Sequence, residues 1–403
     1  MVSLRVPKMA LESKICLPLP SRQPKVEDKA LHAVLKRVYS AKKPVILVDG
    51  EVRWARIEDE VDHIVKSTEW PTFVSGFGKS VLDESLPNVY GVYTPKNKEL
   101  VDSSDLVLCF GGHFSNTNSF LYQTVPKQEL SIFFNAKSVQ VGAEIFRDLP
   151  MNYFLPQLIG HLEMEKLHKY TPELVHPMSV EPPKVSSSDL VSQVGGFWHR
   201  MSSFFQKGDI ILAETGTASY GSNDFVLPQK SRLFRAITWL SIGYMLPATL
   251  GASLAQRDLI ARSEYHDLLD ARSILFIGDG SFQLTAQELA TIIHRKLNVI
   301  IFLINNDGYT IERCIHGRDA KYNDITPWRY LKAPDFFGAP TEGDYAAHTW
   351  EVRTWEDLDK ALTDEKMLKG KGLRMVEVFM DKLDCTPPLD KILELQLSRE
   401  KGQ

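Results

Sequence analysis

Short, continuous apolar runs alternate with segments of helical periodicity along most of the chain. The runs at 44–48, 274–277 and 299–304 are apolar at nearly every position, which is typical of strands buried on both faces of a parallel sheet. Between such runs, apolar residues recur at helical spacing, for example from 31 to 38. This alternation predicts an α/β fold with two doubly wound domains whose sheets are mainly parallel.

Two proline-rich stretches with little periodicity interrupt the alternation. One opens the chain and the other follows the first set of strands and helices, and such composition favours connecting segments. We therefore predict an N-terminal connector at 1–28, a central α/β domain at 29–162, a linker at 163–188, a second α/β domain at 189–385 and a C-terminal tail at 386–403.

Composition excludes several classes of function. The net charge is -4 and no Lys/Arg block occurs, so neither a nucleic acid nor a membrane surface is an expected partner. No apolar run reaches the length of about 18 residues that a membrane helix needs, and the N-terminus lacks the apolar segment of a signal peptide. The four cysteines form no CxxC pair, which favours reduced thiols over a disulfide frame or a zinc site. We expect a cytoplasmic protein.

Polar residues stand at the ends of two predicted strands in the second domain. Asp279 follows one apolar run and Asn306 the next, with a helical segment between them. The carboxyl ends of parallel strands meet at one edge of a sheet, where open α/β sheets bind ligands. A carboxylate, an amide and the Gly308 carbonyl are hard oxygen ligands suited to Mg²⁺, and Gly280 and Ser281 open a helix whose N–H groups favour phosphate. The pattern predicts a magnesium diphosphate cradle.

The constellation Gly278-Asp279-Gly280-Ser281, followed by Asn305-Asn306-Asp307-Gly308-Tyr309-Thr310-Ile311-Glu312, resembles the signature of the thiamine diphosphate-dependent decarboxylases, and of the pyruvate decarboxylase family in particular. The resemblance implies thiamine diphosphate and Mg²⁺ as cofactors and a small 2-oxo acid as substrate. The implied reaction is non-oxidative decarboxylation, with pyruvate giving acetaldehyde and CO₂. An indolepyruvate or phenylpyruvate decarboxylase is an alternative.

The resemblance also assigns cofactor-binding residues. Ile242 would support the bent cofactor from below, and Leu240, which stands where the family usually has glycine, would contact it through its backbone carbonyl. A β-branched side chain is stiff enough for such a support; a plain core isoleucine is the alternative. The full implied set is Thr215, Thr217, Leu240, Ser241, Ile242, Asp279, Gly280, Ser281, Asn306, Gly308, Tyr309, Thr310 and Ile311, with Asp279, Asn306 and Gly308 as metal ligands.

Glu312 is the implied catalytic proton donor, acting together with Ile242. Ile311 and Ile315 lie four positions apart on a predicted helix and would flank the carboxyl. Desolvation by these neighbours would raise its pKa, which suits proton transfer near neutral pH. The same two isoleucines would narrow the substrate pocket and favour pyruvate over aromatic 2-oxo acids. An exposed helix glutamate is the alternative interpretation.

In the family that the chain resembles, a glutamate and a His-His pair belong to an N-terminal pyrimidine-binding domain. No His-His pair occurs in this sequence, so we expect a truncated form that releases little acetaldehyde alone. Partners would be identical or full-length chains, since sites in this family are shared between subunits. The alternative is a non-catalytic subunit that binds the cofactor or serves assembly.

Overall fold

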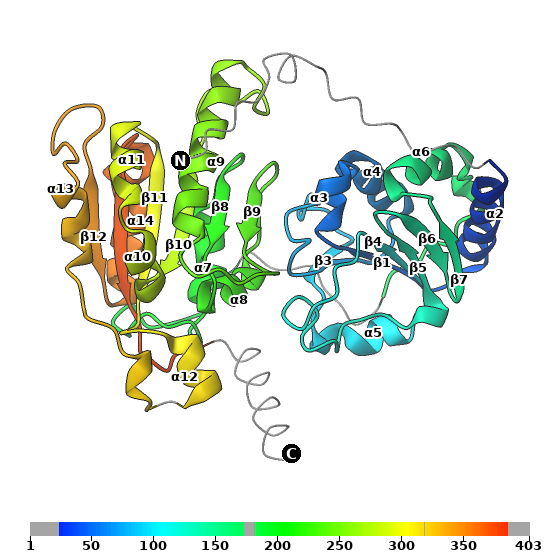
Figure 1. Ribbon diagram of the computed structural model, residues 1–403, viewed down its shortest axis with the longest axis horizontal. Coiled ribbons are helices and arrows are strands. Elements are labelled where there is room, and N and C mark those ends of the chain that lie inside the picture. The colour runs from blue at the N-terminus through cyan, green and yellow to red at the C-terminus, as the bar shows by residue number, and fades with distance from the viewer. Residues whose placement is uncertain (1–23, 173–180, 182, 318, 386–403) are drawn as a thin grey trace, which may run out of the picture.

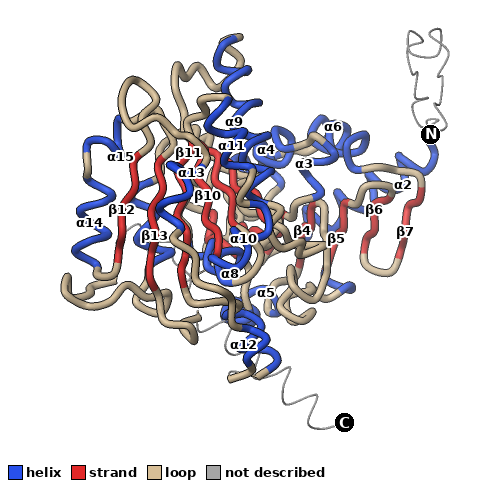
Figure 2. The backbone as a smooth tube through the Cα atoms, turned by 60° about the vertical axis from the view of Figure 1, so that its left-hand side comes forward, coloured by secondary structure: helices blue, strands red, loops and turns tan. Residues whose placement is uncertain are grey.

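The computed structural model describes residues 24–172, 181, 183–317 and 319–385. Two sheets stand side by side, each flanked by helices (Figures 1 and 2). The first has seven strands in the order β3-β2-β1-β4-β5-β6-β7, and the second has six in the order β12-β13-β11-β10-β8-β9. All strand pairs are parallel except β5 with β6 and β6 with β7. The predicted fold class, two α/β domains with mainly parallel sheets, is confirmed.

The central domain is built from these elements: α2 Pro24–Ser40, β1 Pro44–Val48, α3 Glu51–Ala55, α4 Glu58–Thr68, β2 Thr72–Val74, β3 Val89–Val92, α5 Lys98–Asp102, β4 Leu106–Phe110, β5 Ser131–Phe134, β6 Ser138–Val141, β7 Glu144–Arg147 and α6 Met151–His161.

The second domain is built from these elements: α7 Phe197–Met201, β8 Ile210–Ala213, α8 Thr217–Gly221, β9 Arg232–Arg235, α9 Met245–Ala261, β10 Ser273–Gly278, α10 Asp279–Thr285, α11 Glu288–His294, β11 Val299–Asn305, α12 Thr310–His316, α13 Ala333–Phe336, β12 His348–Val352, α14 Trp355–Thr363, α15 Glu365–Lys369 and β13 Arg374–Phe379.

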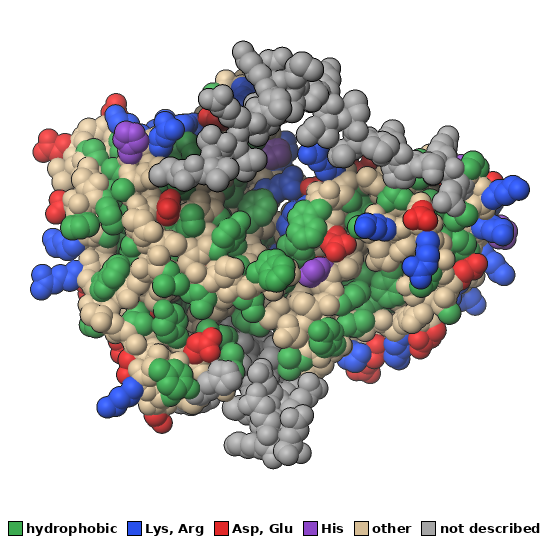
Figure 3. Space-filling model, in the orientation of Figure 1, with side chains coloured by type: hydrophobic (Ala, Val, Ile, Leu, Met, Phe, Trp, Pro, Cys, Tyr) green, Lys and Arg blue, Asp and Glu red, His purple; other side chains and the backbone are tan. Residues whose placement is uncertain are grey.

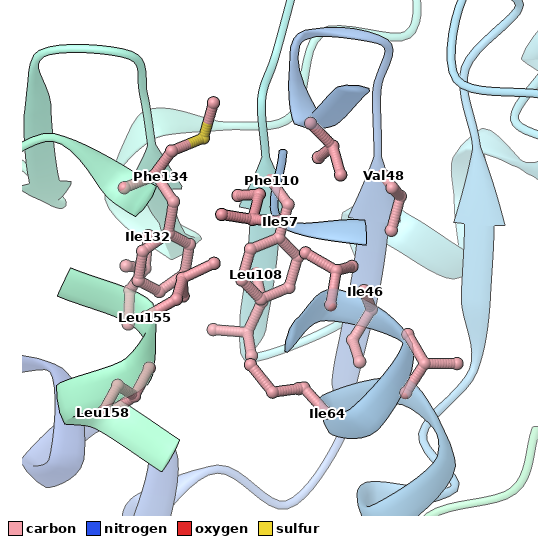
Figure 4. Packing of buried hydrophobic residues seen from close by; sticks show 14 of the residues in the cluster. Ile46, Val48, Ile57, Ile64, Leu108, Phe110, Ile132, Phe134, Leu155 and Leu158 are labelled. Atoms are coloured by element: carbon pink, nitrogen blue, oxygen red, sulfur yellow. The ribbon is translucent and has the colours of Figure 1, made fainter. Parts of the chain in front are cut away.

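The core of the central domain lies between its sheet and the covering helices. Phe110 of β4 and Phe134 of β5 stack with ring centroids 4.7 Å apart, and Leu155 and Leu158 of α6 belong to the same cluster of buried side chains (Figure 4). Every residue of β1 is buried, as its unbroken apolar run predicts. Burial of these side chains, not local propensity, is what fixes the strands in place.

The predicted N-terminal connector is wrong at its end, because residues 24–28 form the first turn of α2. Proline is compatible with the first helical position, where no intrahelical N–H bond is needed. Glu27 is buried in this turn and Ala30 directly after it, so packing extends the helix further towards the N-terminus than the periodicity suggested. Residues 1–23 and the tail at 386–403 lie outside the described residues, as does most of 173–182.

Buried hydrogen bonds join the two domains. Arg235, at the end of β9, donates from Nε to the Gly76 carbonyl at 2.8 Å and from Nη1 to the Ser219 carbonyl at 2.6 Å. Ser80 Oγ accepts a bond from the Leu233 N–H at 2.7 Å. These bonds fix the edge strand β9 against the loop that follows β2. None of the helices in the described part of the chain combines the length and apolar character that crossing a bilayer requires.

Candidate active site

Three neighbouring strands of the second sheet end in polar residues. The chain passes from β8 to β9 on one side and from β10 to β11 on the other, so β8 and β10 flank a topological switch point, where such sheets bind ligands. Thr215 follows β8, Asp279 follows β10 and Asn306 follows β11. Gly278 pairs with Ile304 in the parallel ladder, which brings the ends that carry Asp279 and Asn306 together.

Asp279 is buried and held by backbone donors. Its Oδ1 accepts a bond from the Gly280 N–H at 2.7 Å, and its Oδ2 accepts one from the Gly308 N–H at 3.0 Å. Burial raises the pKa of Asp279 to about 6, although these N–H bonds oppose the shift. Asn306 is also buried. A carboxylate and an amide at adjacent strand ends suit a hard divalent cation such as Mg²⁺.

Two positions in this loop require glycine. Gly308 has a φ of +120°, and a Cβ there would lie 2.2 Å from the Asn323 carbonyl oxygen. A Cβ on Gly280 would lie 2.7 Å from the Tyr309 ring. The buried Arg313 supports the same loop by donating from Nη2 to the Asp307 carbonyl at 2.5 Å. Glycine thus allows the backbone N–H groups to approach Asp279 closely.

A cavity of about 340 Å³ opens beside these strand ends, within the usual size of a cofactor site. Eight predicted site residues line it: Thr215, Leu240, Ile242, Ser281, Tyr309, Ile311, Glu312 and Ile315. Two buried atoms on its wall, Thr215 Oγ1 and Asn223 Oδ1, have no hydrogen-bond partner in the described part of the chain. Unpartnered buried polar atoms are costly, and they fit a wall that receives a polar ligand.

The other predicted site residues lie outside the cavity lining. Asp279, Gly280, Asn306 and Gly308 are buried at the strand ends, Thr217 begins α8, and Ser241 is exposed. The Thr310 hydroxyl donates to the Lys382 carbonyl at 2.9 Å, so this side chain ties α12 to the segment after β13. The part of the chain that the structure describes has no cluster of three or more His, Cys, Asp or Glu that could hold a metal; the predicted ligand set contains only one carboxylate.

Glu312 lies in the first turn of α12 and lines the cavity. Ile311 and Ile315 line the same cavity, as expected. Glu312 as a whole is only partly buried. The reason is that α12 lies beyond the strand ends, at the margin of the domain (Figures 1 and 2).

Leu240 has a left-handed backbone with a φ of +51°. This region costs a residue with a Cβ about 1–2 kcal/mol, whereas glycine, the residue that the resemblance led us to expect here, adopts it without that cost. The side chain of Leu240 lines the cavity, and the neighbouring Ile242 is 37% exposed. Both side chains therefore stand at the open mouth of the cavity and not in the core.

Glu214 is a site residue that the sequence analysis missed. It is fully buried; its Oε1 accepts a bond from the Thr215 N–H and its Oε2 one from the Met245 N–H, both at 2.8 Å. Burial raises its pKa, against the lowering effect of these N–H groups. The carboxylate thus ties the start of α9 to the end of β8 and holds the turn that carries Leu240 and Ile242. An acidic residue directly after an apolar strand was the available signal, because a buried carboxylate needs partners.

We predict that Glu214→Gln weakens both the fold and the site. An amide offers one acceptor oxygen to the two N–H donors, so one donor loses its partner at a cost of about 1–3 kcal/mol. The free energy of unfolding falls by this amount, and affinity for the thiamine diphosphate that the resemblance implies falls by about 10- to 100-fold. Denaturant unfolding and calorimetric titration measure the two effects. Glu144→Gln, an exposed substitution on β7, is the matched control and leaves both unchanged.

The raised pKa of Asp279 gives a pH dependence of stability in the metal-free chain. Folding raises the pKa from 3.8 to about 6, so between these values the folded state binds the proton more tightly than the unfolded chain. The free energy of unfolding therefore decreases as pH rises from about 4 to about 6, by up to about 3 kcal/mol relative to Asp279→Asn. Urea unfolding of both proteins across this range tests it, and parallel pH profiles would contradict it.

The central domain supplies one wall of the cavity, which the sequence analysis did not anticipate. Its lining includes Gly76 and residues 116–118, 120 and 121. Asn118 is held there by Asp49, whose Oδ2 accepts its Nδ2–H at 2.9 Å. Burial raises the pKa of Asp49. Gly76, in the glycine turn that follows β2, thus contributes to the cavity wall.

Two family models match the chain. The central domain model of thiamine pyrophosphate enzymes matches residues 31–160, and the C-terminal TPP binding domain model matches residues 215–378. A pyruvate decarboxylase of Aspergillus parasiticus is 59% identical over 403 residues, which cover 100% of this chain and 70% of that protein. A pyruvate decarboxylase of Candida glabrata is 34% identical over 99% of this chain and 69% of its own length.

Solved structures share the fold. Benzoylformate decarboxylase from Polynucleobacter necessarius superposes with a TM-score of 0.65 at 15% identity, over 93% of this chain and 68% of its own. A 4-hydroxybenzoylformate decarboxylase from Rhodococcus jostii gives 0.65 at 16% identity, over 92% of this chain and 66% of its own. At such low identity the likeness speaks for the fold alone. Pyruvate decarboxylases are carboxy-lyases, and the sequence relationship decides the family: the chain belongs to the pyruvate decarboxylase family of thiamine pyrophosphate enzymes.

Proposed function

We propose that this site binds thiamine diphosphate through Mg²⁺ and serves the non-oxidative decarboxylation of pyruvate to acetaldehyde and CO₂. The observation that carries the proposal is the meeting of Asp279, Asn306 and the Gly308 backbone at two strand ends beside a cavity that Glu312 lines. Asp279, Asn306 and the Gly308 carbonyl would hold the Mg²⁺, which takes its remaining oxygens from the diphosphate and water.

Bound there, thiamine diphosphate would supply the electron sink that accepts the pair released when CO₂ leaves. The chain's own residues would orient the reactants and move a proton. Ile242, stiff at χ1, would hold the cofactor from the mouth of the cavity. Glu312 would donate the proton that replaces CO₂, and Ile311 and Ile315 would leave room for a methyl group better than for an aromatic ring. Faster turnover of phenylpyruvate than of pyruvate would remove this last argument.

We also propose that the chain works in the cytoplasm, as a homo-oligomer or together with full-length chains. The four cysteines show no CxxC spacing, which favours reduced thiols, as is usual in a reducing compartment. Large apolar side chains are exposed on and beside the turn that carries Leu240 and Ile242, with Trp239 88%, Tyr244 57% and Leu284 52% exposed. Figure 3 shows apolar side chains on the face where the domains meet. Exposed apolar surface of this kind favours association.

A complementation assay tests the proposed function. The chain is assayed with thiamine diphosphate, Mg²⁺ and pyruvate, alone and after co-expression with a full-length pyruvate decarboxylase whose own metal-binding aspartate has been replaced. We expect little acetaldehyde from the chain alone and clear release from the mixed complex, lost again when the chain carries Asp279→Asn. Release by neither preparation would contradict the proposal.

A further inference from the structure

Two cysteines lie in contact beneath the wall of the cavity. The sulfurs of Cys314 on α12 and Cys385 after β13 are 3.8 Å apart, although 71 positions separate them in the sequence. Both side chains are buried. Sequence reasoning treated the four cysteines as scattered thiols, because no CxxC spacing joins them; only the fold brings these two together.

The backbone on both sides of this contact is anchored. Thr310, at the start of α12, donates its hydroxyl to the Lys382 carbonyl, which ties the two cysteine-bearing segments to each other. Asp384, next to Cys385, accepts the Val194 N–H at 3.3 Å and the Gln193 N–H at 2.5 Å. The sulfurs are thus held near each other by bonds other than their own, which favours intramolecular reaction over reaction with a second chain.

The two thiols also lie close to the cavity, which small molecules can enter. Tyr220, Ile311 and Ile315 pack directly on them, and the same three side chains line the cavity. One layer of partly buried side chains therefore separates the sulfurs from the open volume. Zinc takes four ligands. Within the residues described, no third His, Cys, Asp or Glu completes a cluster with these two sulfurs, so the pair does not make a zinc site.

We propose that Cys314 and Cys385 form a reversible disulfide, a modification site that closes beneath the cavity wall when a hydroperoxide oxidises one of the two thiols. In the first step a cysteine sulfur attacks one peroxide oxygen, the O–O bond breaks, and a sulfenic acid and water form. The second thiol then attacks the sulfenic sulfur; the S–S bond forms, the S–O bond breaks, and a second water leaves. Two thiols and one hydrogen peroxide thus give one disulfide and two waters.

The bond would act on α12, because Glu312 lies two positions before Cys314 in the same helix. Bond formation shortens the sulfur separation from 3.8 Å to about 2.05 Å. This draws α12 towards the segment after β13 and couples the cavity wall to the redox state of the pair.

Thiol mapping after peroxide treatment tests the proposal. The folded chain is treated with graded hydrogen peroxide, denatured, alkylated, digested and analysed by mass spectrometry. We expect a peptide pair joined through Cys314 and Cys385, lighter by two hydrogen atoms than the two free peptides and separated by dithiothreitol. Cys109 is the internal control: it is fully buried, burial raises its pKa well above its ordinary value, and it packs in the central domain. Its thiol survives to a peroxide dose at least about tenfold higher.

Cys314→Ser and Cys385→Ser each abolish the linked pair, and melting curves show whether these variants fold. Wild-type protein alone supplies a second readout, since a disulfide raises the melting temperature and dithiothreitol reverses the rise. The proposal is overturned if both cysteines become sulfinic acids without linkage, if they stay alkylatable at doses that oxidise Cys109, or if they link to Cys16 or to another chain. The test needs neither cofactor nor substrate, so its failure leaves the proposed function standing.

Discussion

Replacing Asp279 by alanine is expected to reduce the affinity of the chain for thiamine diphosphate in the presence of Mg²⁺ by at least about 100-fold. The substitution removes the one carboxylate among the proposed metal ligands, and it leaves the Gly308 N–H, now bonded to Asp279 at 3.0 Å, without its acceptor. Both changes weaken the same loop. Calorimetric titration of the cofactor at fixed Mg²⁺ measures the loss.

Asp307→Asn is the matched control for this experiment. Asp307 lies in the same loop, but it is exposed and has a φ of +57°, which asparagine tolerates well. Removing its charge should leave cofactor affinity within about threefold of the original value, because an exposed charge contributes little. Equal losses for both variants would indicate that loop charge, and not metal ligation by Asp279, governs binding.

Replacing Glu312 by glutamine is expected to lower the rate of acetaldehyde release by about 10²- to 10⁴-fold, the usual contribution of a positioned acid. Glutamine keeps the size of the side chain at the cavity wall but has no proton of suitable acidity to donate. Affinity for thiamine diphosphate stays unchanged, because Glu312 is not among the proposed ligands of the metal or the diphosphate. Steady-state kinetics in the preparation that releases acetaldehyde separates the two quantities.

The control for Glu312 is Glu365→Gln. Glu365 also lies in the first turn of a helix, but its side chain is 78% exposed and pairs with Lys369 one turn later. Glu365 does not line the cavity, so its replacement should leave the rate of acetaldehyde release unchanged. If Glu312→Gln kept more than about half of the original rate, the proton would have to come from another group, and the assignment of Glu312 as the acid would be wrong.

The second sheet could be predicted well from the sequence, because its strands are buried on both faces. The apolar runs before Asp279 and Asn305 became β10 and β11, in parallel register over the whole of β10, and the glycine spacing around Gly308 matched a backbone that leaves no room for a Cβ. Where burial and local conformation act on the same short stretch, the pattern of residues was sufficient to predict the arrangement.

Interactions between distant segments could not be predicted from the sequence. Glu214 holds Met245, 31 positions away, and Arg235 reaches Gly76 across the domain boundary; neither spacing has a periodic signal. Two other features depend in the same way on how the two sheets and α12 are placed. They are the part of the cavity wall that the central domain supplies and the contact between Cys314 and Cys385. Helical spacing alone also could not show how deeply Glu312 is buried, because that depends on where α12 lies in the domain.

The central claim is that residues at the ends of β10 and β11 bind one divalent ion, which in turn binds a diphosphate. Crystals of the chain grown with thiamine diphosphate and Mn²⁺ in place of Mg²⁺ test it most directly, through the anomalous signal of the metal. The account predicts a single peak about 2.0–2.3 Å from Asp279 Oδ and Asn306 Oδ1, with diphosphate oxygens on its open side. A peak elsewhere, or a diphosphate bound away from these two side chains, would contradict it.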